Sequence, residues 1–276
     1  MTSASIVAFD ILCFLGMVLL IAVFCTAWCS SKVPRASTWF NFIASCILAT
    51  VVNLLILGQQ AGKSPNRTSC VIQAISTYSV TVLSAHTAAA LIFQAYLCMI
   101  FIRKSRRLSV CHIRLLNIVP FLTPIGIQIY GITIGLQNPS LLQRDQSGMR
   151  CYVVARQLHE CSVLASLVGV FMLFVLEVLV VFNLFRFRRT YEVLLTGSKM
   201  SPRVIIRVCF FNVFVFMAVI ASLVPVGNSL NDKGIVDLTA AIIPVAAGII
   251  FGTQKDILTV WMFWRSPAMF PVPSSV

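Results

Sequence analysis

The sequence predicts an all-α membrane protein, a bundle of seven transmembrane helices followed by a short amphipathic eighth helix. Of its 276 residues, 59% are hydrophobic and 11% are charged, whereas a soluble domain has about 45–50% and about 25%. The apolar residues fall into seven runs long enough to cross a bilayer, and most Lys and Arg residues lie between these runs. One bundle accounts for the whole length, so we expect a single domain over residues 1–276.

The stretch from Cys70 to Lys104 is expected to organise the bundle. It contains no Asp, Glu, Lys or Arg before Arg103. Only a helix can carry so apolar a segment through lipid, because its backbone groups must be satisfied internally. The stretch exceeds the roughly 20 residues that a span needs, so we expect this helix to tilt or to protrude from the bilayer.

The predicted spans cover residues 6–28, 39–58, 71–102, 115–136, 161–185, 202–226 and 235–251. The first span follows a tail without Lys or Arg and contains Asp10 near its start. The second carries Asn41 and Asn53 and ends at Gly58, before the polar loop QQAGKSPNRTS. Cys70 then precedes the third span, which ends at a basic cluster.

The last four predicted spans differ in polar content and in how they begin. The fourth contains two prolines, which are expected to kink it, and a long loop over residues 137–160 follows it. The fifth holds Glu177 in mid-span. The sixth begins at Ser201 and Pro202, an N-cap residue followed by a proline at the first helical position. The seventh contains Pro244.

The eighth helix is predicted over residues 256–265. Gly252 ends the preceding span, and Thr253 and Asp256 have the spacing of a capping box, in which Thr caps the helix and Asp reaches back. Three aromatic residues follow within this helix, two of them Trp, and such residues favour the headgroup level of a membrane. We therefore expect a helix that lies along the interface.

The distribution of Lys and Arg predicts an N-terminus outside and a C-terminus in the cytoplasm, because cytoplasmic loops carry an excess of both. This orientation places most of the 21 basic residues inside. The basic residues expected to face the inner lipid surface or a cytoplasmic partner include Arg103, Lys104, Arg106, Arg107, Arg186, Arg188 and Arg189. The only usable glycosylation sequon begins at Asn66, and it falls outside.

Three cysteines lie near the outer surface in this orientation: Cys70, Cys151 and Cys161. A disulfide can persist on that side of the membrane. Three cysteines allow three single pairings, and the residues alone leave the choice among them open.

The chain resembles a G-protein-coupled receptor in its seven spans and in its outer cysteines, one at the top of the third span and one in the second outer loop. The ending FGTQKD with a Trp-rich amphipathic stretch is similar to fungal receptor-like seven-helix proteins, and the fungal pheromone receptors are a more distant likeness. The chain departs from many such receptors at Gln94, Ala95 and Tyr96, which stand where an Asp/Glu-Arg-Tyr triplet is common. The sixth span also lacks the usual Trp before its proline.

The resemblance implies a disulfide between Cys70 and Cys151, an extracellular ligand and a cytoplasmic G protein that docks on the basic inner clusters. It also implies a multi-pass protein of the plasma membrane. A simpler interpretation of the basic clusters is that they set the topology and attract anionic lipid.

Three polar residues inside the spans are the candidate ligand contacts: Tyr78, His86 and Glu177. Tyr78 lies about two turns below Cys70, at the depth of an outer pocket. An ionisable residue at the depth of Glu177 normally faces the bundle interior or a wet cavity, and His86 is its expected partner. The alternative is structural: a protonated Glu177 and a packed His86 can each hydrogen-bond to a neighbouring helix.

Other function classes are less compatible with these residues. The seventh span has no Lys to bind retinal, and His86 is the one His in mid-span, whereas a zinc hydrolase needs several His and Asp residues that converge. We expect no enzyme activity, no cofactor, no metal and no nucleic-acid partner. A membrane transporter or a lipid-handling protein remains the alternative to a receptor, with Glu177 as its proton or substrate site.

Overall fold

The computed structural model describes residues 3–31, 33, 35–60, 66–103, 108–145, 148–186, 207, 212 and 230–262. Its helices are α1 (Ser3–Cys29), α2 (Ser37–Leu54), α3 (Arg67–Arg103), α4 (Val110–Gln137), α5 (Arg156–Arg186), α8 (Leu230–Gly252) and α9 (Lys255–Trp261). The predicted all-α class is confirmed for this part of the chain, apart from one small hairpin of two strands.

Five of the described helices, α1 to α5, are long and apolar enough to cross a membrane. The segment Asp237–Gly252 of α8 forms a sixth candidate together with α9, although the two are bent by 81°. These helices are those of a multi-pass membrane protein. The predicted sixth span, 202–226, lies outside the described residues except for Arg207 and Asn212, so the count of seven spans stays a prediction.

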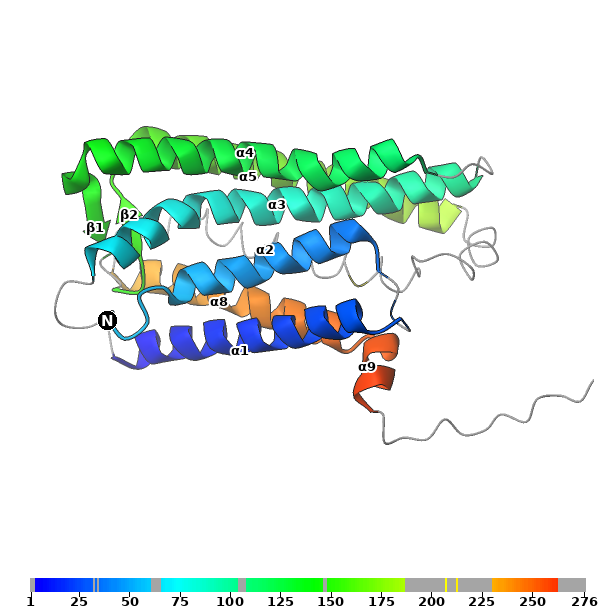
Figure 1. Cartoon of the computed structure of the whole chain (residues 1–276), viewed down its shortest axis with the longest axis horizontal. Coiled ribbons are helices and arrows are strands. Elements are labelled where there is room, and N and C mark those ends of the chain that lie inside the picture. The colour runs from blue at the N-terminus through cyan, green and yellow to red at the C-terminus, as the bar shows by residue number, and fades with distance from the viewer. Residues whose placement is uncertain are drawn as a thin grey trace, which may run out of the picture.

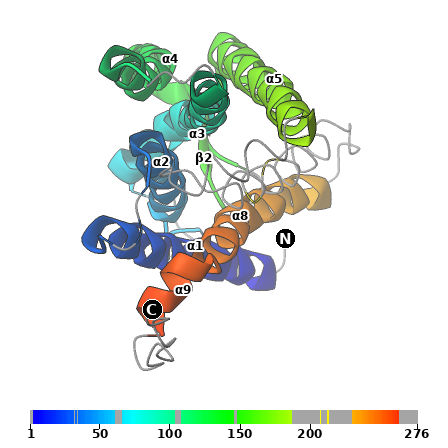
Figure 2. The same ribbon diagram turned by 90° about the vertical axis from the view of Figure 1, so that its right-hand side faces the viewer.

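Helices α1 to α5 run in alternating directions, α8 runs in the same direction as α5, and α3 lies in the middle of the bundle (Figures 1 and 2). It packs against α2, α4 and α5, as we expected of the stretch that begins at Cys70. On the other side of α2, helix α1 pairs with α8. This pairing depends on small residues: a Cβ added at Gly248 would lie 2.6 Å from Leu19 Cβ, and one added at Gly16 would lie 2.8 Å from Pro244 Cβ.

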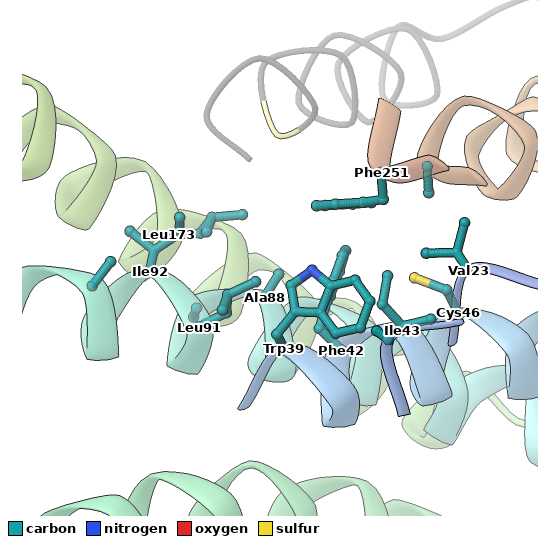
Figure 3. Close-up of a cluster of buried hydrophobic side chains, with 14 of the residues drawn as sticks. Val23, Trp39, Phe42, Ile43, Cys46, Ala88, Leu91, Ile92, Leu173 and Phe251 are labelled. Carbon is teal, nitrogen blue, oxygen red and sulfur yellow. The ribbon is translucent and has the colours of Figure 1, made fainter. Parts of the chain in front are cut away.

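A buried apolar cluster joins five of the long helices near the end of the bundle that carries α9. Trp39 and Phe42 of α2 meet Phe251 of α8 at ring-centroid distances of 6.1 and 5.9 Å. Figure 3 shows these rings among aliphatic side chains of α1, α3 and α5, including Val23, Leu91 and Leu173. The α9 helix joins the same cluster through Ile257. Apolar packing therefore fixes this end of the bundle.

The predicted loop over residues 137–160 contains regular structure that we did not expect. A short 3₁₀ turn, Pro139–Leu141, leads into β1 (Leu142–Arg144), which pairs antiparallel with β2 (Cys151–Val153). Helix α5 then begins at Arg156, five residues before the predicted start of the fifth span. The hairpin lies at the end of the bundle where α1 begins, opposite to α9 (Figure 1). One end of the bundle is thus covered by folded backbone.

The capping box predicted for the eighth helix is wrong. The N-cap of α9 is Gln254, and its side chain makes no capping hydrogen bond. Thr253 Oγ1 instead accepts a hydrogen bond from Arg207 Nη1 at 3.1 Å, and Asp256 forms an ion pair with Arg35. Arginines from other segments therefore engage both side chains that were expected to cap the helix.

Candidate functional site

A disulfide joins Cys70, in the first turn of α3, to Cys151, at the start of β2. This is the pair that the resemblance implies, and Cys161 is a free, exposed cysteine. The bond attaches the hairpin directly to the central helix. Closing so long a loop of chain stabilises a fold by about 2–4 kcal/mol.

Gln73 strengthens the same attachment, one helical turn from Cys70. Its side chain is completely buried. The Oε1 atom accepts a hydrogen bond from the backbone N–H of Cys151 at 2.9 Å. The Nε2 atom donates to the carbonyl oxygens of Val52 and Asn53, each at 3.1 Å. One amide group therefore joins the hairpin, α3 and the end of α2.

The tip of the hairpin extends from α3 to the α1–α8 pair. Gly148 has a φ of +78°, a conformation that L side chains rarely adopt, and a Cβ there would lie 3.0 Å from the carbonyl oxygen of Gln60. The next residue, Met149, is fully buried and packs with Phe9, Ala241 and neighbouring side chains of both helices. The hairpin thus crosses the end of the bundle and is anchored at both sides.

Arg150 follows Met149 and joins the hairpin to α8 electrostatically. Its Nε lies 3.4 Å from Asp237 Oδ1, and the two side chains are 19% and 14% exposed. The guanidinium also lies over the ring of Phe9, with Cζ 5.4 Å from the ring centroid. Arg150 Nε and Nη2 are buried and have no hydrogen-bond partner among the described residues.

A pocket of about 590 Å³ lies beneath this hairpin. Its wall includes Tyr78 of α3, His159 of α5 and Asp237 of α8, together with Arg150 and the residues that lead from β2 into α5. The volume falls within the range of about 300–1,000 Å³ that is typical of small-molecule sites. Three helices and the tethered hairpin therefore contribute to one concave site.

Tyr78 is the one predicted ligand contact that the structure places in this pocket. Its hydroxyl donates to the carbonyl oxygen of Val153 at 3.2 Å, and its ring meets the His159 ring edge-on at 6.3 Å. Its own carbonyl oxygen accepts a hydrogen bond from Ser162 Oγ at 3.2 Å. Tyr78 thus connects α3, the hairpin and α5 at the wall of the pocket.

His86 lies eight residues further along α3, about 12 Å deeper into the bundle. Its Nδ1 is 3.0 Å from the carbonyl oxygen of Val82 in the preceding turn. Its ring lies next to Gly169 of α5, where an added Cβ would be 3.6 Å from Cδ2. His86 is therefore not among the residues that line the outer pocket.

Glu177 is buried still deeper, 18 residues beyond His159 on α5 and about 27 Å along the helix axis. The expected pairing of Glu177 with His86 is wrong. Among the described residues, the Glu177 carboxyl lies beside the side chain of Asn212 instead. Neither Glu177 Oε1 nor Asn212 Nδ2 has a hydrogen-bond partner in the described part of the chain. The three predicted ligand contacts therefore do not form one site.

Asn66, the predicted glycosylation site, precedes α3 at the hairpin end of the bundle (Figure 1). It is exposed, and its Oδ1 accepts a hydrogen bond from the backbone N–H of Thr68 at 3.0 Å. Its own backbone N–H donates to Gln59 Oε1 at 2.6 Å. Glycosylation of this residue stays a prediction.

The basic residues predicted to face the cytoplasm belong to the opposite end. Arg103 and Arg186 are the last residues of α3 and α5. The others of that group, Lys104, Arg106, Arg107, Arg188 and Arg189, lie outside the described residues. At this end Arg35 binds α9 through Asp256 and Gln254 and lies over the Trp39 ring, with Cζ 5.6 Å from its centroid.

Two residues that the sequence analysis missed, Gln73 and Arg150, form much of the hairpin attachment. A signal for Gln73 was present, since it lies three residues after Cys70 and so on the same face of the helix. Arg150 directly precedes Cys151, on the side of the membrane where basic residues are expected to be scarce. No group of three or more potential metal ligands occurs within the described ranges.

Neither a scan against protein-family models nor a search of curated proteins finds a match to this chain.

Proposed function

We propose that this protein is a receptor-like integral membrane protein that binds an extracellular ligand beneath the hairpin and signals to a cytoplasmic G protein. The observation that carries the proposal is the pocket, because its wall combines α3, α5 and α8 with a hairpin that a disulfide attaches to α3. All three helices continue to the opposite end of the bundle (Figure 1). A ligand that contacts them differently in two arrangements would shift the population of those arrangements.

The orientation in this proposal follows the positive-inside rule, with the hairpin, Asn66 and the disulfide outside and α9 at the cytoplasmic interface of the plasma membrane. The basic residues after α3 and α5 would then form the docking face for the G protein. The resemblance to G-protein-coupled receptors supports this assignment.

Nucleotide exchange in lipid nanodiscs tests the proposal. The purified chain is incubated with heterotrimeric G proteins and a panel of small molecules, and we expect at least one compound to accelerate exchange. Tyr78→Ala should abolish this response because Tyr78 lines the pocket. Tyr130→Ala is the matched control, since Tyr130 lies on α4 and its hydroxyl bonds to Gln157 at 2.9 Å. An equal response from both variants would contradict the assignment.

A transporter or lipid-handling protein is the second candidate, and the environment of Glu177 favours it. A carboxyl group inside a membrane helix is costly when one oxygen has no hydrogen-bond partner, as is the case for Glu177 Oε1 in the described part of the chain. Such groups often mark proton or substrate pathways. Solute flux or lipid transfer in proteoliposomes that is lost in Glu177→Gln would support this candidate. Ligand-stimulated exchange on a G protein without any flux would support the receptor.

A further inference from the structure

Arg150 is the lining residue that indicates what the pocket binds. Arginine has five N–H donors in a planar fork. Its Nε lies 3.4 Å from Asp237 Oδ1, which is longer than the roughly 2.7–2.9 Å of a charge-assisted hydrogen bond. Nε and Nη2 are buried without a hydrogen-bond partner among the described residues. Buried charged donors without an acceptor are unfavourable, so this group favours an additional anionic partner.

The acidic residues of the pocket provide a weaker basis for binding a cation. Asp237 pairs with Arg150 and has a further interaction besides. Asp145 also has a further interaction, and its backbone N–H donates to the carbonyl oxygen of Arg150 at 2.8 Å. The N–H groups of Arg150 therefore favour an anionic ligand more than the two carboxylates favour a cationic one.

The remainder of the wall near Arg150 is largely apolar. Ala74 of α3 and the segment Val153, Val154 and Ala155 line the pocket together with the ring of Tyr78. Pockets of this composition bury the apolar body of a ligand and orient it through a few polar groups. The site thus combines one largely buried cation with an apolar surface.

We propose that the pocket binds an amphipathic organic acid, with its carboxylate on the Arg150 fork and its apolar body against the β2–α5 segment. A carboxylate accepts two parallel hydrogen bonds from such a fork. Because Arg150 Nε and Nη2 are buried, the carboxylate reaches them only when the guanidinium turns away from Asp237, so binding loosens the ion pair between the hairpin and α8. This inference rests on the proposed function only in using the same pocket, because binding is measured without a G protein.

The experiment measures, by titration calorimetry, how three probes with the same phenyl group and three-carbon chain bind to the full chain in nanodiscs. The probes are phenylpropanoate, phenylpropanamide and phenylpropylamine, which carry an anionic, a neutral and a cationic head group. We expect the acid to bind at least about tenfold more tightly than the amide, the effect of one charged hydrogen-bonding group. Arg150→Met, which keeps an unbranched apolar side chain but removes the guanidinium, should remove this preference.

Arg144→Met is the matched control, because Arg144 lies on β1 of the same hairpin and does not line the pocket. It should keep the preference for the acid. Asp237→Asn provides a second test that does not depend on the folding of Arg150→Met. It removes the competing carboxylate, so the acid should bind several-fold more tightly.

Three results would overturn the inference: no binding of the acid at millimolar concentration, tightest binding of the amine, or weaker acid binding in Asp237→Asn. A preference for the acid that survives in folded Arg150→Met would do the same. Acid binding without stimulated nucleotide exchange would leave this inference standing and contradict the receptor proposal. Exchange stimulated by neutral or cationic compounds alone would support the receptor and contradict the choice of an acid.

Discussion

Replacing Gln73 with Leu should loosen the attachment of the hairpin to the bundle more than replacing any other Asn or Gln side chain near the hairpin. The change keeps the approximate volume but removes three hydrogen bonds, one from the Cys151 N–H and two to the carbonyl oxygens of Val52 and Asn53. The bond from the Cys151 N–H is the costliest to lose, because this donor is buried and an apolar side chain offers it no acceptor.

The expected loss of stability follows from the separate contributions. An orphaned buried donor costs about 1–3 kcal/mol, and a typical hydrogen bond contributes about 0.5–1.5 kcal/mol. The Val52 carbonyl also accepts a bond from the N–H of Leu55 at 3.3 Å, so it is not left alone. We therefore expect a loss of about 2–4 kcal/mol, which corresponds to a fall in Tm of about 3–7 °C for a chain of this size.

Thermal unfolding of the purified protein in detergent measures the effect. Gln143→Leu is the matched control, because Gln143 is an exposed residue of β1 in the same hairpin and should change Tm by little. Hydrogen exchange at the β1–β2 amides should be faster in Gln73→Leu and unchanged in the control. Equal Tm values for Gln73→Leu and the native protein would refute the conclusion that this amide holds the hairpin.

Three further substitutions test other parts of the structure. Gly248→Leu should push α1 away from α8, since its Cβ would lie 2.6 Å from Leu19 Cβ, and should lower the free energy of unfolding by about 1–3 kcal/mol. Gly126→Leu is its control, because no atom of the described residues lies within 4 Å of an added Cβ there. Arg35→Ala removes the ion pair to α9, so hydrogen exchange of the α9 amides should become faster. Glu177→Leu removes a buried carboxyl whose Oε1 has no hydrogen-bond partner among the described residues, so Tm should stay equal or rise while G-protein activation or transport falls.

Each of these expectations has a contrary outcome. A Gly126→Leu variant as unstable as Gly248→Leu would show that the close α1–α8 approach is not the cause. Unchanged exchange in α9 of Arg35→Ala would mean that the ion pair does not hold this helix, leaving apolar packing and the Trp261–Thr26 hydrogen bond. A Glu177→Leu variant with full activity and normal surface expression would assign Glu177 to packing rather than to function.

The positions of the described helices could be predicted well because apolarity is a local property. The predicted first span, 6–28, lies within α1, and the predicted third span, 71–102, lies within α3. In lipid every backbone group of such a run must be bonded within the segment, so the run itself specifies a helix. The hairpin was not predicted, because its strands are only three residues long and too short to show a pattern of alternating polarity.

The candidate site could be predicted only in part. Tyr78 was placed at the right depth because depth follows from the rise per residue below Cys70. The pairing of Glu177 with His86 failed because the register of α5 against α3 places Gly169, eight residues before Glu177, beside Ala85 and His86. A linear pattern contains the spacing of residues along one helix but not the register between two helices.

By itself, the sequence determined that the chain folds into lipid-compatible helices with basic residues between them, since composition decides which segments leave water. Only the tertiary structure decided which polar groups meet. Arg150 and Asp237 belong to a hairpin and a helix that are far apart in the chain, and their contact at 3.4 Å requires the hairpin to cross the whole end of the bundle. Such contacts arise from how close small residues let the helices approach and from where Gln73 and the disulfide hold β2.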